Sequence, residues 1–147
     1  MALPPQKFRE IVVQLLYSQD FIPIDPVETI PFMMNELKVT KRTMIEVHDR
    51  LDKVTEKLEE IDAKIRDTST EYTFERISKV ERTIIRLGLY ELFYDSTIPD
   101  KVVFAEAIRL CRKFGSPESA NFVNAILDTI YKRDSIVDEL SKQPVSI

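Results

Sequence analysis

Apolar residues recur along most of this chain at intervals of three and four positions, the spacing that places side chains on one face of an α-helix. No stretch alternates apolar and polar residues as a half-buried β-strand does. The pattern therefore predicts an all-α protein with about seven helices, forming a single domain over residues 1–147 whose ends fray at 1–5 and 141–147. Helices are expected from about 8 to 16, 27 to 37, 41 to 66, 79 to 95, 100 to 114 and 117 to 140, with a short turn from 74.

Two of these predicted helices have distinctive patterns. Between 41 and 66 the apolar residues follow a single narrow seam from Met44 to Ile65, which suits packing within a bundle. A coiled coil between two chains needs a longer seam than about three heptads, so a homodimer is permitted but not required. From 79 to 95 apolar residues point in nearly every direction, as expected for a helix inside the protein. Gly88 at its middle costs about 1 kcal/mol against alanine, which predicts that another helix crosses closely there.

The segment from Lys113 to Asp128, KFGSPESANFVNAILD, contains the end of one helix and the start of the next. Gly115 is expected to end the first helix, Ser116 to cap the second and Pro117 to occupy its first position.

Composition narrows the classes of function. The net charge is −4, so a nucleic-acid site must be a local basic patch. Two glycines exclude a Walker loop or a dinucleotide-binding turn, and one cysteine with one histidine excludes a Cys/His zinc cluster. No cofactor is predicted. The N-terminus lacks the apolar run of a signal peptide and no run approaches the ~20 residues of a membrane span, which predicts a cytoplasmic protein with no membrane partner.

Few residues suit catalysis or metal binding. His48 has no second histidine and is interpreted as a surface or packing residue, and Cys111 lies on an apolar stripe as a buried thiol would. The acidic residues Glu59, Glu60 and Asp62 lie among lysines, which favours a solvated ionic face over a metal site. We expect no enzyme activity and no bound metal.

Binding is better supported. Lys79, Arg82 and Arg86 lie within about a sixth of a helix circumference and form a basic stripe that can contact phosphates. Pairing with acids on neighbouring helices is the alternative, and periodicity alone favours it. Lys7 and Arg9 form a thinner basic patch, but they diverge by about 160° around a helix.

The stretches VERTIIRLGLYELFY and IPDKVVFAEAIRLCRKFGSPESANFVNAILD resemble the NusB family of bacterial transcription antitermination factors, and FREIVVQLLYSQD does so more weakly. The resemblance implies a NusB-like fold in which two perpendicular three-helix halves share a buried central helix. It also implies a function without catalysis: binding the single-stranded boxA RNA of ribosomal operons together with the ribosomal protein NusE. The pair joins the RNA polymerase antitermination complex.

Site residues follow from the stripe and from the resemblance together. Arg9 and Arg86 match family arginines, Tyr17 a family aromatic and Glu91 the acid of the NusE-facing surface. The predicted RNA-binding residues are Lys7, Arg9, Lys79, Arg82, Arg86, Asn121 and Asp128. The predicted partner-binding residues are Tyr17, Glu91, Phe122 and Asn124.

Departures from the family pattern suggest weak RNA binding. The N-terminal basic stretch is reduced to Lys7 and Arg9, Ala105 replaces a family asparagine and Ala125 a glycine, and Asn121 stands where the family has lysine. Each lost cation removes a phosphate contact. RNA affinity is therefore expected to be low and to depend on NusE.

Two other functions remain open. A helical adaptor could keep the NusE surface and have lost RNA binding, which the thin basic N-terminus allows. An RNA-targeting domain of an RNA methyltransferase is disfavoured, because the sequence to Ile147 carries no Rossmann-type cofactor motif.

Overall fold

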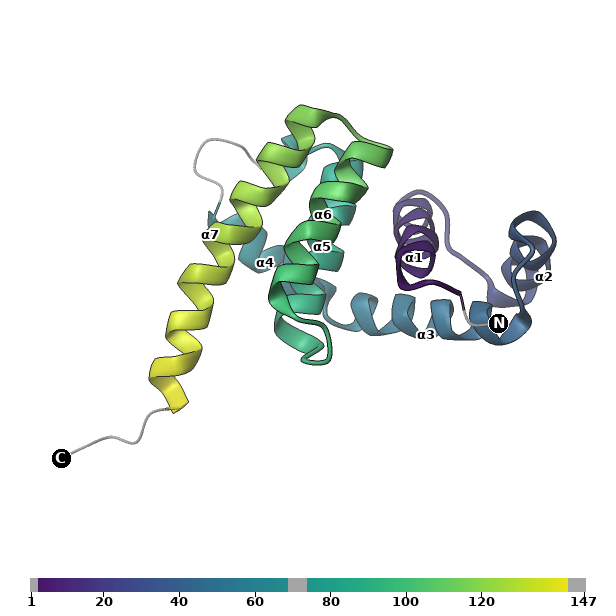
Figure 1. Cartoon of the computed structure of the whole chain (residues 1–147), viewed down its shortest axis with the longest axis horizontal. Helices are drawn as coiled ribbons and strands as arrows, with labels where there is room; N and C mark the ends of the chain where they lie inside the picture. Colours follow the sequence, from purple (N-terminus) through teal and green to yellow (C-terminus); the bar gives the residue numbers. More distant parts are fainter. Residues whose placement is uncertain (1–2, 69–73, 143–147) are drawn as a thin grey trace. The chain divides into compact units, whose positions relative to one another are not determined.

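The computed structural model describes residues 3–68 and 74–142, with side chains described as far as residue 135. Over these residues it contains seven α-helices, one short 3-10 helix and no strand, which confirms the predicted all-α fold (Figure 1). The helices are α1 (Pro5–Gln19), α2 (Pro26–Leu37), α3 (Lys41–Glu56), α4 (Leu58–Thr68), η1 (Phe74–Arg76), α5 (Lys79–Tyr94), α6 (Asp100–Phe114) and α7 (Pro117–Lys142). None of the helices in the described ranges is long and apolar enough to cross a membrane. The predicted fraying concerns ends that lie partly outside the described residues.

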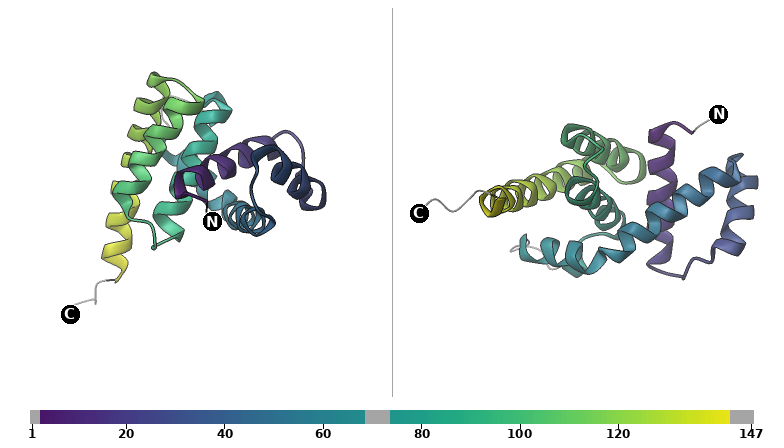
Figure 2. Two further views of the ribbon diagram at one scale, coloured as in Figure 1. Left: turned by 45° about the vertical axis from the view of Figure 1, so that its right-hand side comes forward. Right: turned by 90° about the horizontal axis from the view of Figure 1, so that it is seen from below.

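The chain divides into two compact units, Met1–Leu58 and Glu59–Ile147. In the first unit α1 and α2 both pack against α3, and Figure 2 shows α2 folded back beside the start of α3. The apolar face predicted for the first helix is buried there, including Ile11, Val12, Leu15 and Leu16. In the second unit α5, α6 and α7 pack side by side. A single domain over the whole chain stays a prediction.

The single helix predicted from 41 to 66 is wrong, because the chain breaks at Lys57 between α3 and α4. The Lys57 backbone N–H donates to the Val54 carbonyl, three residues back, at 3.1 Å. Immediately before the break, the Thr55 hydroxyl donates to the Leu51 carbonyl at 2.8 Å, a bond known to bend helices. The seam itself is buried on both sides of the break, so its three-and-four spacing gave no indication of the interruption.

Helix α5 provides the core of the second unit. Every residue from Thr83 to Glu91 is buried, as the all-round apolar pattern predicted. Gly88 is the point of closest approach to α7: a Cβ there would lie 3.2 Å from both terminal methyl carbons of Leu127. The predicted close helix crossing at Gly88 is therefore confirmed.

The junction between α6 and α7 follows the predicted capping. The Ser116 hydroxyl accepts from the Ser119 backbone N–H at 3.1 Å, and Pro117 is the first residue of α7. Gly115 ends α6 without positive φ, but a Cβ would meet the Cys111 carbonyl at 3.1 Å and the Ser119 side chain at 3.2 Å. A glycine is needed here for space, which differs from the left-handed conformation that ends many helices.

Candidate nucleic-acid interface

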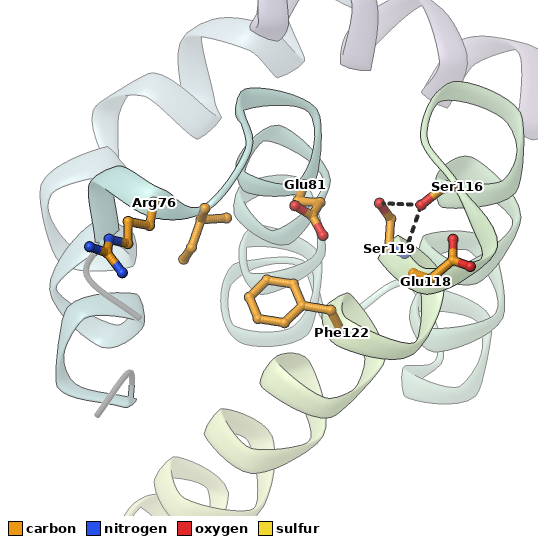
Figure 3. A pocket seen from close by; sticks show the side chains of 7 residues that line it. Arg76, Glu81, Ser116, Glu118, Ser119 and Phe122 are labelled. Atoms are coloured by element: carbon orange, nitrogen blue, oxygen red, sulfur yellow. Dashed lines mark hydrogen bonds between the residues drawn. The ribbon is translucent and has the colours of Figure 1, made fainter. Parts of the chain in front are cut away.

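A pocket of about 400 Å³ opens in the second unit where η1 and the starts of α5 and α7 meet. Its lining residues are Arg76, Ile77, Glu81, Ser116, Glu118, Ser119 and Phe122. Figure 3 shows the Phe122 ring pointing into it, the hydroxyls of Ser116 and Ser119 on one side, and the Arg76 side chain extending away at the rim. The pocket thus combines a half-exposed aromatic ring with hydroxyls, carboxylates and one exposed guanidinium. An unpaired base stacks on such a ring, and polar groups of this kind bond to base edges and phosphates.

Capping interactions hold the pocket walls in place. Ser78 and Glu81 form a capping box at the start of α5: the Glu81 N–H donates to the Ser78 hydroxyl at 3.1 Å, and the Ser78 N–H donates to the Glu81 carboxylate at 3.3 Å. On the opposite wall the hydroxyls of Ser116 and Ser119 lie 3.1 Å apart. The two walls are therefore the first turns of two helices, which rigidify side chains near the opening.

Of the residues predicted on α7, Phe122 lines this pocket, and Asn121, Asn124 and Asp128 lie outside its lining on the same helix. Asn121 is exposed, and Asn124 and Asp128 are half-buried one and two turns further along. Asp128 pairs with Lys132 at 3.0 Å on the helix surface. A surface pair of this kind contributes little to stability, so Asp128 stays accessible to a partner.

The basic stripe of α5 becomes progressively more buried along the helix. Lys79 is exposed, Arg82 is half-buried and Arg86 is only 8% exposed. The Arg86 guanidinium makes a two-point contact with Asp62 on α4, with Nε and Nη2 each 2.9 Å from a carboxylate oxygen. The alternative of pairing with an acid on a neighbouring helix thus describes Arg86. It also shows that the face carrying Asp62 is not wholly solvated.

Sequence reasoning missed the role of Phe74. Its ring has the Arg66 guanidinium carbon 4.2 Å from the centroid, that of Arg82 at 4.4 Å and that of Arg86 at 5.6 Å. Arg82 also donates to the Ile77 carbonyl at 3.1 Å. Cations over an aromatic face are favourable, and here they hold η1 against α4 and α5. Two of the three cations of the α5 stripe, Arg82 and Arg86, are therefore used in folding the second unit.

In the first unit, the predicted residues differ in accessibility. Lys7 is exposed and lies 3.7 Å from Glu10, whereas Arg9 is only 9% exposed. Tyr17 is 37% exposed and contacts the Phe21 ring, with centroids 5.1 Å apart. Lys7 and Tyr17 are thus available at the surface of α1.

Glu91 and the candidates for chemistry are buried. Glu91 is 5% exposed within α5. His48 is buried on α3, and burial lowers its pKa although the charge of Asp52 opposes the shift. Cys111 is fully buried, and burial with the nearby charge of Glu81 raises its pKa to about 11. The interpretations of His48 as a packing residue and Cys111 as a buried thiol are confirmed.

A second, more open pocket of about 750 Å³ lies among α4, α5 and α7. Asp134 accepts from Arg133 at 2.7 Å and from Lys64 at 2.8 Å, and these bonds, that from Arg133 foremost, lower its pKa to about 2. Tyr94 donates to Glu60 at 2.6 Å, and burial followed by this bond raises the Tyr94 pKa to about 12. These polar groups satisfy one another, so we interpret the pocket as a structural network. Within the described residues, no three His, Cys, Asp or Glu side chains are grouped to hold a metal.

Comparison with known proteins agrees with these features. The NusB family model matches residues 6–132. The transcription antitermination protein NusB of Chlamydia pneumoniae is 33% identical over 133 residues, covering 90% of this chain and 83% of its own. That of Lachnoclostridium phytofermentans is 35% identical over 124 residues, covering 83% and 94%.

Solved structures give the same assignment. T. maritima NusB superposes with a TM-score of 0.74 at 29% identity, covering 90% of this chain and 93% of that one. A structure of the antitermination factors NusB and NusE in complex with dsRNA matches with a TM-score of 0.74 at 26% identity, covering 87% and 96%. The sequence match spans both units and nearly the full length of the relatives. This chain belongs to the NusB family.

Proposed function

We propose that this protein is a transcription antitermination factor that binds boxA RNA together with NusE and helps RNA polymerase resist termination. The observation that carries the proposal is the family match over residues 6–132, with relatives named as transcription antitermination proteins. The similar NusB that was solved with NusE and dsRNA supports RNA and NusE as the partners. The protein acts by binding and not by catalysis, in the cytoplasm where the polymerase works.

The pocket at the start of α7 is the part of the surface best suited to RNA. Phe122 supplies a stacking face, Asn121 an exposed amide beside it and Arg76 an exposed cation at the rim. Stacking of a base on an aromatic ring is worth about 1–3 kcal/mol by alanine substitution. Lys79, exposed one helical turn before Arg82, adds a phosphate contact. For NusE we propose contacts at Tyr17 on the first unit and at Phe122 and Asn124 on the second.

RNA binding by the isolated protein is expected to be weak. Of the cations on the α5 stripe, Arg82 faces Phe74 and Arg86 faces Asp62. We therefore expect only about two or three phosphate contacts, made by other exposed cations. For a single strand each contact contributes a slope of about −0.7 in log K against log[salt]. A total slope of about −2 is therefore expected, with a marked gain in affinity when NusE is added.

Fluorescence anisotropy of a labelled boxA RNA tests the proposal, with and without NusE, at ~50 and ~200 mM salt. Phe122→Ala is expected to weaken RNA binding by about 5- to 150-fold, corresponding to the loss of one stacked base. Arg76→Ala is expected to weaken it less and to flatten the salt slope by about one contact. Lys101→Ala on α6 removes a cation that is also exposed but does not line the pocket, and is the matched control.

The outcomes separate RNA binding from a purely protein-binding adaptor. The adaptor is a second candidate because two arginines of the stripe are engaged inside the second unit. RNA binding with NusE that is lost in Phe122→Ala but kept in Lys101→Ala supports the antitermination factor. NusE binding without RNA binding in any condition supports the adaptor. Tight RNA binding by the isolated protein with a steep salt slope contradicts the expected weak affinity.

A further inference from the structure

Helix α2 is apolar in sequence but has no buried residue. Its residues, PVETIPFMMNEL, are largely hydrophobic, yet all of them are exposed or half-buried. By contrast α1 and α3, in the same unit, bury seven and six residues. Val27 is 80% exposed and Phe32 62% exposed. An apolar helix that packs on one neighbour and leaves large side chains in water has a face suited to a partner.

The exposed face of α2 is acidic. Glu28, Phe32 and Glu36 follow one another at four-residue intervals and lie within about 80° around the helix. All three are exposed, and the exposed Asp25 caps the helix by accepting from the Val27 N–H at 3.0 Å. From residue 10 to residue 37 the sequence contains no lysine, arginine or histidine. Phe32 is thus an exposed aromatic ring between two carboxylates, with no cation on its helix.

These charges restrict what can bind there. RNA is excluded because its phosphates are repelled by carboxylates, and an anionic membrane surface is excluded for the same reason. A symmetric contact with a second copy would place Glu28 and Glu36 against the same acids. A basic segment with an apolar side chain at its centre complements the face in both charge and hydrophobicity.

We propose that the Glu28–Phe32–Glu36 face of α2 docks a basic amphipathic segment of a protein partner. An apolar side chain of that segment covers Phe32, and flanking lysines or arginines pair with Glu28 and Glu36. None of these three residues is among those assigned to RNA or NusE, and the test does not depend on that assignment. Pro31 within the helix leaves the Val27 carbonyl without its usual N–H donor four residues on, so packing against a partner would stabilise α2.

Heteronuclear NMR titration of the whole protein with a synthetic peptide tests the proposal. The probe is a leucine–lysine peptide with its leucines on one helical face, and the control peptide has the same composition shuffled so that they are not. The ordered peptide is expected to shift amide resonances of residues 25–37, and the shuffled peptide is expected to bind about 10-fold more weakly. Shifts centred on another helix, or equal binding of the two peptides, overturn the proposal.

Variants check the face itself. Glu28→Lys with Glu36→Lys is expected to weaken binding of the ordered peptide by at least about 10-fold, and Phe32→Ser by about 5-fold. Glu56→Lys with Glu59→Lys makes the same change in net charge at exposed positions outside α2 and is expected to leave affinity within about 2-fold. Equal weakening by this control pair indicates general charge attraction and overturns the proposal.

The other occupants are tested directly. Titration with a single-stranded RNA is expected to leave residues 25–37 unshifted, and an RNA-induced shift there contradicts the proposal. Sedimentation of the wild type and of Phe32→Ser is expected to give the same oligomeric state. A wild-type dimer that Phe32→Ser dissociates would assign the face to self-association instead.

Discussion

Replacing Arg86 by methionine tests whether this arginine serves the fold or RNA. In the structure its guanidinium lies between Asp62, bound at two points, and the Phe74 ring. The side chains of Arg86 and Asp62 are 10% and 13% exposed. Methionine keeps much of the volume and removes the charge. We therefore expect the main effect to be on the free energy of unfolding.

The expected loss of unfolding free energy follows from the charge of Asp62, which would stay buried without its partner. Removing one partner of a buried ion pair costs about 3–5 kcal/mol, because the other charge stays buried without compensation. Because the two side chains are partly exposed, at 10% and 13%, the expected loss for Arg86→Met is about 2–4 kcal/mol. Removing both charges, as Asp62→Leu with Arg86→Met, should recover most of the loss, since replacing a buried pair by apolar residues is often neutral.

Urea unfolding followed by far-UV circular dichroism measures these differences at constant m-value. Arg112→Met, at an exposed arginine of α6, is the control and should change the unfolding free energy by less than about 0.5 kcal/mol. Fluorescence anisotropy of boxA RNA with the same proteins distinguishes a role of Arg86 in the fold from a role in RNA binding. An Arg86→Met protein of wild-type stability that has lost RNA affinity refutes the structural role and places Arg86 in the RNA interface.

Three other predictions concern the second unit. Gly88→Ala should destabilise the protein by about 1 kcal/mol in urea, because overpacking against Leu127 outweighs the gain in helix propensity, and Leu127→Val should reduce the penalty. Cys111, buried and with a pKa of about 11, should not react with Ellman's reagent at pH 8 until the protein is unfolded; prompt reaction of the native protein would show that the thiol is accessible. Tyr94→Phe should remove the ionisation near pH 12 from an ultraviolet titration. Since folding raises the Tyr94 pKa, its contribution to stability is complete below about pH 10 and is lost as the pH rises through 12; an unchanged titration curve would contradict the bond to Glu60.

The helices were predictable because apolar spacing and capping residues act over short distances. Ser116 marks a helix start that the structure reproduces, and the close approach at Gly88 could be inferred from its cost in an otherwise apolar helix. The break at Lys57 could not, because the seam continues through it in register. A threonine hydroxyl turned back onto the helix, as at Thr55, depends on a rotamer that the spacing of apolar residues does not contain.

The candidate site was less predictable, for a physical reason. An arginine spaced for a solvent-facing stripe looks the same in sequence whether it meets a phosphate or a carboxylate of the protein. Asp62, which decides the matter for Arg86, lies 24 residues earlier on another helix. Phe74, which meets Arg82, follows a segment of 69–73 that lies outside the described residues. Only the tertiary arrangement identifies these partners.

Basic and acidic side chains occupy different surfaces of this protein, and this distribution bears on both proposals. Arg82 and Arg86 stabilise the second unit through Phe74 and Asp62, and Arg76 is an exposed cation at the rim of the Phe122 pocket. A weakly basic RNA surface binds selectively only when stacking and a second protein add to it, because phosphate contacts alone give affinity without sequence preference. The acidic face of α2 repels RNA, and we therefore expect a protein partner to bind there. Low intrinsic RNA affinity and a separate acidic docking helix thus both favour a protein that works within an assembly.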